Sequence, residues 1–183
     1  MEEKNQKMPS ILGKKVNLKP LLNNLEELVE EYFKIVNNNL VLRGLGGNKM
    51  SLEEVTLFLK ECKENPKMLE YLIYERTTDK LMGDIYLKEN TGDINLKNAE
   101  FGIMIDPDYH KKGYGKESIK LILRHGFEKL DYRLISLSVY KYNTNAINLY
   151  KNVGFKIINE SIDKENGKEE WIMDIEKECI YNL

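Results

Sequence analysis

The sequence predicts an α/β fold built on a single mixed sheet. Alternating apolar segments and amphipathic segments follow the order β-α-α-β-β-β-α-β-α-β-β along the 183 residues. Two pairs of consecutive strands are joined by short polar turns, as expected of antiparallel hairpins. The segments at 99–105, 117–130 and 133–140 instead form a strand–helix–strand crossover, which joins parallel strands.

The N-terminal segment is expected to contain one strand, one helix and a loop. Residues 14–21 alternate between apolar and polar side chains, which predicts a strand. Asn24 is the expected N-cap of a helix with a single apolar stripe, so the helix is expected to cover one face of the sheet. Residues 37–49 are polar and rich in glycine, which predicts a loop.

A second helix and a hairpin are expected next. Ser51 and Glu54 have the spacing of a capping box, which predicts a helix that begins there and ends near residue 64. The segments at 68–76 and 81–89 are rich in strand-forming residues and flank the polar turn Thr-Thr-Asp-Lys. They are therefore predicted to pair as antiparallel strands.

The C-terminal part is expected to add a helix and a second hairpin. Residues 143–152 form an amphipathic segment that follows the crossover unit directly. The segments at 155–163 and 168–176 are predicted strands on either side of Asn166 and Gly167. Asn-Gly is a strong signal for a tight hairpin turn, because both residues tolerate a left-handed backbone.

The segment at 103–116 predicts a phosphate-binding loop. A strand leads into a glycine-containing loop that opens a helix, where the first N–H groups lack partners inside the helix and lie at the positive end of its dipole. Gly113 and Gly115 allow the backbone to approach an anion closely. Three lysines add positive charge: Lys111, Lys112 and Lys116. The spacing matches neither a Rossmann nor a P-loop motif.

A second motif follows at 143–155, reading Asn-Thr-Asn-Ala-Ile-Asn-Leu-Tyr-Lys-Asn-Val-Gly-Phe. Together with the loop His110-Lys-Lys-Gly-Tyr-Gly115, it resembles the signatures of the GNAT superfamily of acetyl-CoA-dependent N-acetyltransferases. Every position of the second signature is matched. His110 departs from the family pattern, which usually has Gln or Arg, and this affects one side-chain contact but not the backbone cradle.

The resemblance implies a fold and a cofactor. The fold would be a mostly antiparallel twisted sheet with helices on both faces, in which the parallel crossover unit holds acetyl-CoA. The backbone of the strand at 103–105 would pair with the pantetheine arm, the loop would hold the pyrophosphate, and Asn143 would contact the arm. The expected cofactor-binding residues are Ile103, Met104, Ile105, His110, Lys111, Lys112, Gly113, Tyr114, Gly115, Lys116 and Asn143.

Two residues are expected to be catalytic. Glu100 shares one face of its strand with Gly102, and this glycine is expected to leave room beside the carboxylate for a water molecule or an ammonium group. Tyr150 resembles the family tyrosine that protonates the departing thiolate. A salt-bridging glutamate and a core tyrosine are the alternative interpretations of these two residues. The glycine-rich segment at 44–49 lacks the Ser or Thr of a P-loop and is interpreted as a rim over the acceptor site.

Composition narrows the classes of function. A net charge of −2 gives no basic field for nucleic acid, and no apolar run approaches the roughly 20 residues of a membrane span. Cys62 and Cys179 have no metal or redox spacing, which favours a reducing cytoplasm, and neither histidine lies in a metal-ligand pattern. We expect one domain over residues 1–183 with a core at about 14–176, and no metal cofactor.

The identity of the acceptor is left open by the sequence. The resemblance is to the branch of ribosomal-protein-alanine and spermidine acetyltransferases, so a peptide N-terminus, a polyamine and an aminoglycoside all remain candidate amine acceptors, and a homodimer is also allowed. A non-catalytic acyl-CoA-binding or sensor domain on the same fold is the alternative function, because fold does not fix function. A nucleotide-binding regulatory module is a third interpretation.

Overall fold

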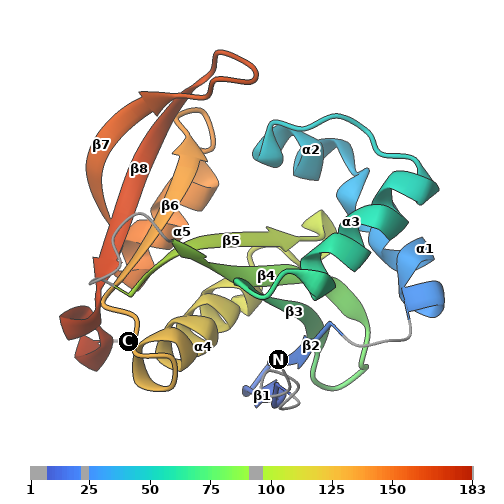
Figure 1. The fold of residues 1–183 in the computed structure, drawn as a ribbon, viewed down its shortest axis with the longest axis horizontal. Coiled ribbons are helices and arrows are strands. Elements are labelled where there is room, and N and C mark those ends of the chain that lie inside the picture. Colours follow the sequence, from blue (N-terminus) through green and yellow to red (C-terminus); the bar gives the residue numbers. More distant parts are fainter. Residues whose placement is uncertain (1–7, 22–24, 91–96, 183) are drawn as a thin grey trace.

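The computed structural model describes residues 8–21, 25–90 and 97–182. These residues form an eight-stranded sheet with the order β1-β2-β3-β4-β5-β6-β8-β7. Neighbouring strands run antiparallel except for β5 and β6, which run parallel (Figure 1). The strands are β1 Ile11–Leu12, β2 Val16–Pro20, β3 Met68–Glu75, β4 Leu81–Asn90, β5 Asn98–Ile105, β6 Leu134–Tyr140, β7 Lys156–Ile162 and β8 Glu169–Glu176. The mixed, mostly antiparallel sheet is the predicted one.

Helices cover both faces of the sheet, as predicted. The apolar face of α4 packs on β2 to β5, with Ile119, Ile122 and Phe127 fully buried, and α5 lies beside it (Figure 1). On the opposite face α1 and α3 form a second core with Leu72 and Met104 of the sheet. The helices are α1 Leu25–Val36, α2 Asn39–Leu45, α3 Leu52–Glu64, α4 Tyr114–Glu128 and α5 Thr144–Val153, with short 3-10 turns η1 Pro107–Tyr109 and η2 Lys177–Asn182.

The predicted helix starts are confirmed where a capping side chain was visible in the sequence. Ser51 and Glu54 form the complete capping box of α3, and Asn143 caps α5. The expected cap of α1, Asn24, lies outside the described residues. No helix in the described part of the chain is long and apolar enough to cross a membrane.

Two expectations about the loops were wrong. Residues 39–45 form helix α2 rather than a loop, with Asn38 as N-cap and Gly46 as a left-handed C-cap. Helix α4 begins at Tyr114, three residues before the expected start, so much of the predicted phosphate loop is the first turn of the helix. The predicted hairpin of β7 and β8 is confirmed; it closes between Asp163 and Lys168, and Asn166 and Gly167 lie in its turn.

Buried acids interrupt the core beneath α1 and α3. Glu70 of β3 and Asp84 of β4 are 2% and 8% exposed, and Tyr32 of α1 donates a hydrogen bond to Asp84. Burial raises the pKa of both carboxyls, that of Asp84 to about 6, and the charge of Asp84 raises the pKa of Glu70 further. Glu70 is therefore the acid that keeps a proton.

Candidate active site

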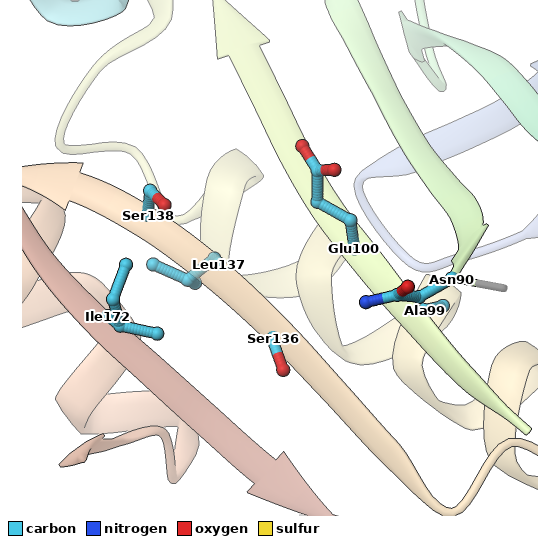
Figure 2. Close-up of a pocket in the computed structure, with 7 residues that line it drawn as sticks. All are labelled: Asn90, Ala99, Glu100, Ser136, Leu137, Ser138 and Ile172. Atoms are coloured by element: carbon cyan, nitrogen blue, oxygen red, sulfur yellow. The ribbon is translucent and has the colours of Figure 1, made fainter. Parts of the chain in front are cut away.

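The parallel strands β5 and β6 separate part-way along their length. Among the described residues their ladder pairs Asn98 with Leu134 and ends where Glu100 meets Ser136. Both strands continue, β5 to Ile105 and β6 to Tyr140, while β5 stays paired with β4 along its other edge. A cleft of about 160 Å³ opens at the point of separation, and Figure 2 shows Glu100 of β5 and Ser138 of β6 on its two sides.

The separation leaves one edge of β5 available to a ligand. Asp106 donates its N–H to Met82 of β4, and alternate residues of an antiparallel strand direct their peptide groups to the same neighbour. Met104 therefore pairs with β4, whereas the Phe101 carbonyl and both peptide groups of Ile103 point toward the cleft. The Ile105 N–H also points there, while the Ile105 carbonyl lies 2.9 Å from the His110 ring. An extended ligand could add here as a strand. Of the expected residues 103–105, two present backbone groups to it, and Met104 presents none.

The helix that follows β5 presents its N-terminus at the end of this open edge. Gly113 is the N-cap with a left-handed φ of 87°, and within the described residues it forms no side-chain capping bond. The first N–H groups of α4, from Tyr114, Gly115 and Lys116, are thus available to an anion. Lys111 also has a left-handed φ, of 59°, which helps the loop to turn back onto the helix.

The polar side chains of the loop fix its shape. The His110 ring nitrogen Nε2 lies 2.9 Å from the Ile105 carbonyl oxygen, and Lys112 Nζ donates to the Asp108 carbonyl at 2.8 Å. Tyr114 donates its hydroxyl proton to Glu75 at 2.5 Å. His110 and Lys112 therefore contact the backbone of residues 105–108, and Tyr114 is tied to the end of β3. Lys111 and Lys116 are exposed beside the helix N-terminus.

Gly115 has a packing role. A Cβ atom at this position would lie 3.3 Å from the side chains of both Ile105 and Leu149, closer than a comfortable contact. The glycine thus lets α4 approach β5 and α5 closely. Its N–H group still lies in the first turn of the helix, so both roles are compatible.

A basic groove that the sequence did not reveal lies beside the loop. It has a volume of about 610 Å³, and the turn after β1 forms one wall of it. Glu117, an acid in this groove, accepts hydrogen bonds from the backbone N–H groups of Lys14 and Lys15, so its charge is already engaged. The cationic residues that line it are Lys14, Lys15, Arg76, Lys116, Lys120 and Arg124. The fold brings three of these, Lys14, Lys15 and Arg76, from outside the strand–helix–strand unit, and their positions in the sequence gave no signal.

Glu100 lies in the cleft, but the space beside it is not vacant. A Cβ atom at Gly102 would lie 2.2 Å from the ring of Tyr86, so the Tyr86 ring fills the gap that the glycine was expected to leave for water or an ammonium group. Tyr86 donates a hydrogen bond to Glu100 at 3.2 Å. The role of Gly102 is therefore to admit this tyrosine, which the sequence analysis missed because the pairing of two strands decides it.

Tyr150 lies on the opposite face of β5. Its ring packs edge-on against Phe101 at 6.0 Å and against Phe155 at 5.9 Å, and it is 8% exposed. Burial raises the pKa of the Tyr150 phenol well above its ordinary value. The phenol therefore remains protonated across the physiological range, and full transfer of its proton to a thiolate becomes less favourable than from a free phenol. It is suited to donating a hydrogen bond to a developing thiolate.

Asn143 and the α2 segment lie at the other end of β6. The Asn143 side-chain oxygen accepts from the Ala146 N–H at 3.3 Å, so the residue caps α5, and its amide nitrogen faces Gly44. Gly46 follows α2 and lies against the Tyr140 ring, where any side chain would clash. Tyr142 donates to the Arg43 carbonyl at 2.7 Å. The glycine-rich segment is thus anchored to β6.

The donor groups at the cleft suit an acyl-CoA. An open strand edge can pair with the amides of pantetheine, and a helix N-terminus with lysines can hold a pyrophosphate. Within the described residues no cluster of three or more His, Cys, Asp or Glu side chains could bind a metal ion.

Comparison with known proteins gives a consistent result. A family model described as an acetyltransferase (GNAT) domain matches residues 18–156. An N-acetyltransferase 9-like protein of Caenorhabditis briggsae is 26% identical over 148 residues, which cover 73% of this chain and 72% of that protein. Spermidine N(1)-acetyltransferase of Escherichia coli is 38% identical over 64 residues, 35% of this chain and 34% of that protein.

Among solved structures, spermidine N-acetyltransferase from Vibrio cholerae in complex with CoA and spermine has a TM-score of 0.78 with this chain. The two are 19% identical, and the match covers 93% of this chain and all of that one. At this identity the similarity shows the fold.

The helix N-terminus can be tested with Gly113→Val. A β-branched residue is strained at a φ of 87° and obstructs the approach of an anion, so we expect CoA affinity to fall about ten-fold or more in calorimetry. Gly167→Val is the matched control, because Gly167 has a φ of 71° at an open hairpin turn. It should lose stability but keep CoA affinity. A folded Gly113→Val protein with wild-type affinity would eliminate the anion cradle.

Proposed function

The chain belongs to the GNAT acetyltransferase family, and from this premise we propose that it transfers the acetyl group of acetyl-CoA to a primary amine in a ternary complex. The observation that supports this most strongly is the separation of β5 from β6. It exposes a strand edge that ends at a helix N-terminus, with Glu100 on one face and Tyr150 on the other.

The cofactor-binding residues would act mainly through their backbones. Ile103 and Ile105 would pair with the pantetheine arm, and the N–H groups after Gly113 would hold the pyrophosphate, with Lys111 and Lys116 adding charge. Acetyl-CoA supplies the activated acetyl group. One N–H group on the open edge of β5 would donate to the thioester oxygen, where negative charge develops during attack. Asn143 would keep its capping bond and offer its amide nitrogen to the arm.

The two faces of β5 would divide the proton transfers. Glu100 would accept the proton of the attacking amine, directly or through water, or would hold the ammonium group before attack. Tyr150 would stabilise the departing thiolate by donating a hydrogen bond from the other side. The strand lies between the carboxylate and the phenol, so the phenol cannot pass its proton directly to the carboxylate.

A small amine is the acceptor that the relatives favour. The matched proteins of Escherichia coli and Vibrio cholerae are both named as spermidine acetyltransferases, although the sequence match to the Escherichia coli enzyme covers only about a third of this chain. Basicity distinguishes the candidates. An N-terminal amine with a pKa of about 7.8 is roughly 14% neutral at pH 7, whereas an amine near 10.4 is roughly 0.04% neutral, a difference in deprotonation cost of about 3.5 kcal/mol. A polyamine acceptor would therefore depend more strongly on Glu100 than a peptide N-terminus.

We also place the protein in the cytoplasm. Cys62 and Cys179 are both free thiols, which is consistent with a reducing compartment. Two further statements stay predictions: that the protein forms a homodimer, and that residues 1–183 form a single domain.

An amine panel tests the proposed function. The wild-type protein is mixed with acetyl-CoA and spermidine, an aminoglycoside or a peptide with a free N-terminus, and release of thiol is followed together with the mass of the product. We expect thiol release with at least one amine, which gains one acetyl group. Binding of acetyl-CoA without turnover of any amine would favour the sensor alternative, and competition by free nucleotide would favour the regulatory module.

In the same assay Tyr150→Phe should lower kcat by about 10²-fold or more with little change in the KM for acetyl-CoA.

A pH–rate series on Glu100→Gln separates the two roles of Glu100. If the carboxylate accepts the amine proton, the loss of activity should be largest at low pH and should shrink as bulk water supplies neutral amine. If it anchors the ammonium group, the acceptor KM should be raised by a constant factor throughout. We expect convergence of the two curves above the amine pKa. Superimposed curves at every pH would show that Glu100 has neither role.

A further inference from the structure

Glu100 has a hydrogen-bond donor on the neighbouring strand. The Tyr86 hydroxyl of β4 donates to Glu100 Oε1 at 3.2 Å, on the sheet face that α1 and α3 cover. Tyr86 pairs in register with Gly102, two residues along from Glu100, so its side chain reaches diagonally to the carboxylate. A side chain that fixes a carboxylate at the edge of the cleft is suited to positioning it.

The ring of Tyr86 is held on both sides. On the β5 side it occupies the space above Gly102, where even a Cβ atom would lie 2.2 Å from the ring. On the β3 side its partner in the ladder is Glu70, which is buried. The pair Tyr86–Gly102 therefore fixes the hydroxyl within reach of Glu100, and a larger residue at 102 would displace it.

We propose that Tyr86 is a positioning residue for the acetyl transfer, which holds the Glu100 carboxylate at the cleft between β5 and β6. The proposal rests on the proposed function for the step that Glu100 serves. It assigns to Tyr86 an action through Glu100, without contact to acetyl-CoA or the amine. It also gives a reason for a glycine at position 102.

The charged groups around this pair keep Tyr86 a neutral donor. Burial raises the pKa of the Tyr86 phenol, and the negative charge of Glu100 raises it further, followed by Glu70 and Asp84. Glu70 and Asp84 share this face, and Tyr32 of α1 donates to Asp84. Lys88 of β4 lies directly opposite Glu100 in the ladder, and the structure shows no ion pair between them in the part of the chain that it describes. The neutral hydroxyl is thus the observed donor to the carboxylate.

Tyr86→Phe removes the donor and keeps the ring. Loss of a hydrogen bond to a charged group destabilises the carboxylate form of Glu100. In a plot of kcat/KM for the amine against pH, the acidic limb should therefore shift to higher pH by about one unit, with about a ten-fold loss of activity on that limb. Tyr32→Phe is the matched control. It removes a hydroxyl that serves Asp84 on the same face, so it should lower the melting temperature without moving the limb.

A second measurement does not need enzymatic activity. In protein with 13C-labelled glutamate carboxyls, the Glu100 signal is assigned by its loss in Glu100→Gln and is titrated with pH. The midpoint of this signal should rise in Tyr86→Phe and stay in place in Tyr32→Phe. Any of three results would overturn the proposal. The midpoint of the Glu100 signal could stay unchanged in Tyr86→Phe, or it could shift while the pH–rate profile of that variant does not. The third such result is an equal effect of Tyr86→Phe and Tyr32→Phe on both measurements. A protein that acetylates no amine but shows the shifted midpoint would instead contradict the proposed function.

Discussion

The early end of the β5–β6 ladder is the constraint on which the candidate site depends. Parallel strands that stayed paired beyond Glu100 would satisfy the Phe101 carbonyl, both peptide groups of Ile103 and the Ile105 N–H within the sheet. Because the strands separate, these groups face a cleft and can bind an extended ligand. Each hydrogen bond gained there contributes about 0.5–1.5 kcal/mol net, so several together can position an acyl chain along the strand.

The same strand connects the cleft to the anion site and to the two side chains of the proposed chemistry. Its carboxyl end leads through η1 to the N-terminus of α4, which places a helix dipole at the end of the open edge. Strand pleating puts Glu100 on one face and Phe101, with Tyr150 beside it, on the other. Acetyl transfer requires a proton acceptor at the amine and a donor at the thiolate, and this geometry separates them.

The sequence predicted the sheet and the helix faces because their signals are local. Periodicity identified the longer strands, and capping side chains identified the starts of α3 and α5. Helix α2 was missed because Asn and Gly make up most of residues 37–49, while its stability comes from its caps and from the burial of Val41 in the core beneath α1 and α3. The first turn of α4 was interpreted as a loop because Gly113 and Gly115 are poor helix formers. The structure shows that the helix already begins at Tyr114.

The parts of the site that escaped prediction depend on register and on long-range packing. Tyr86 meets Glu100 and Gly102 only because β4 pairs with β5 in one register, which no local pattern specifies. Lys14, Lys15 and Arg76 reach the groove beside the loop through the turn after β1 and the end of β3. The GNAT motifs predicted the loop and Tyr150 as site residues, and the fold places the other residues around them.

Residue-resolved amide hydrogen exchange with and without CoA tests the central claim most directly. The account predicts that CoA slows exchange at Ile103 on the open edge. At Met104, whose N–H already pairs with β4, exchange should change little, so it is the internal control. Saturating CoA that leaves Ile103 exchange unchanged, or protects Met104 equally, would contradict the claim that the unpaired edge of β5 receives the cofactor.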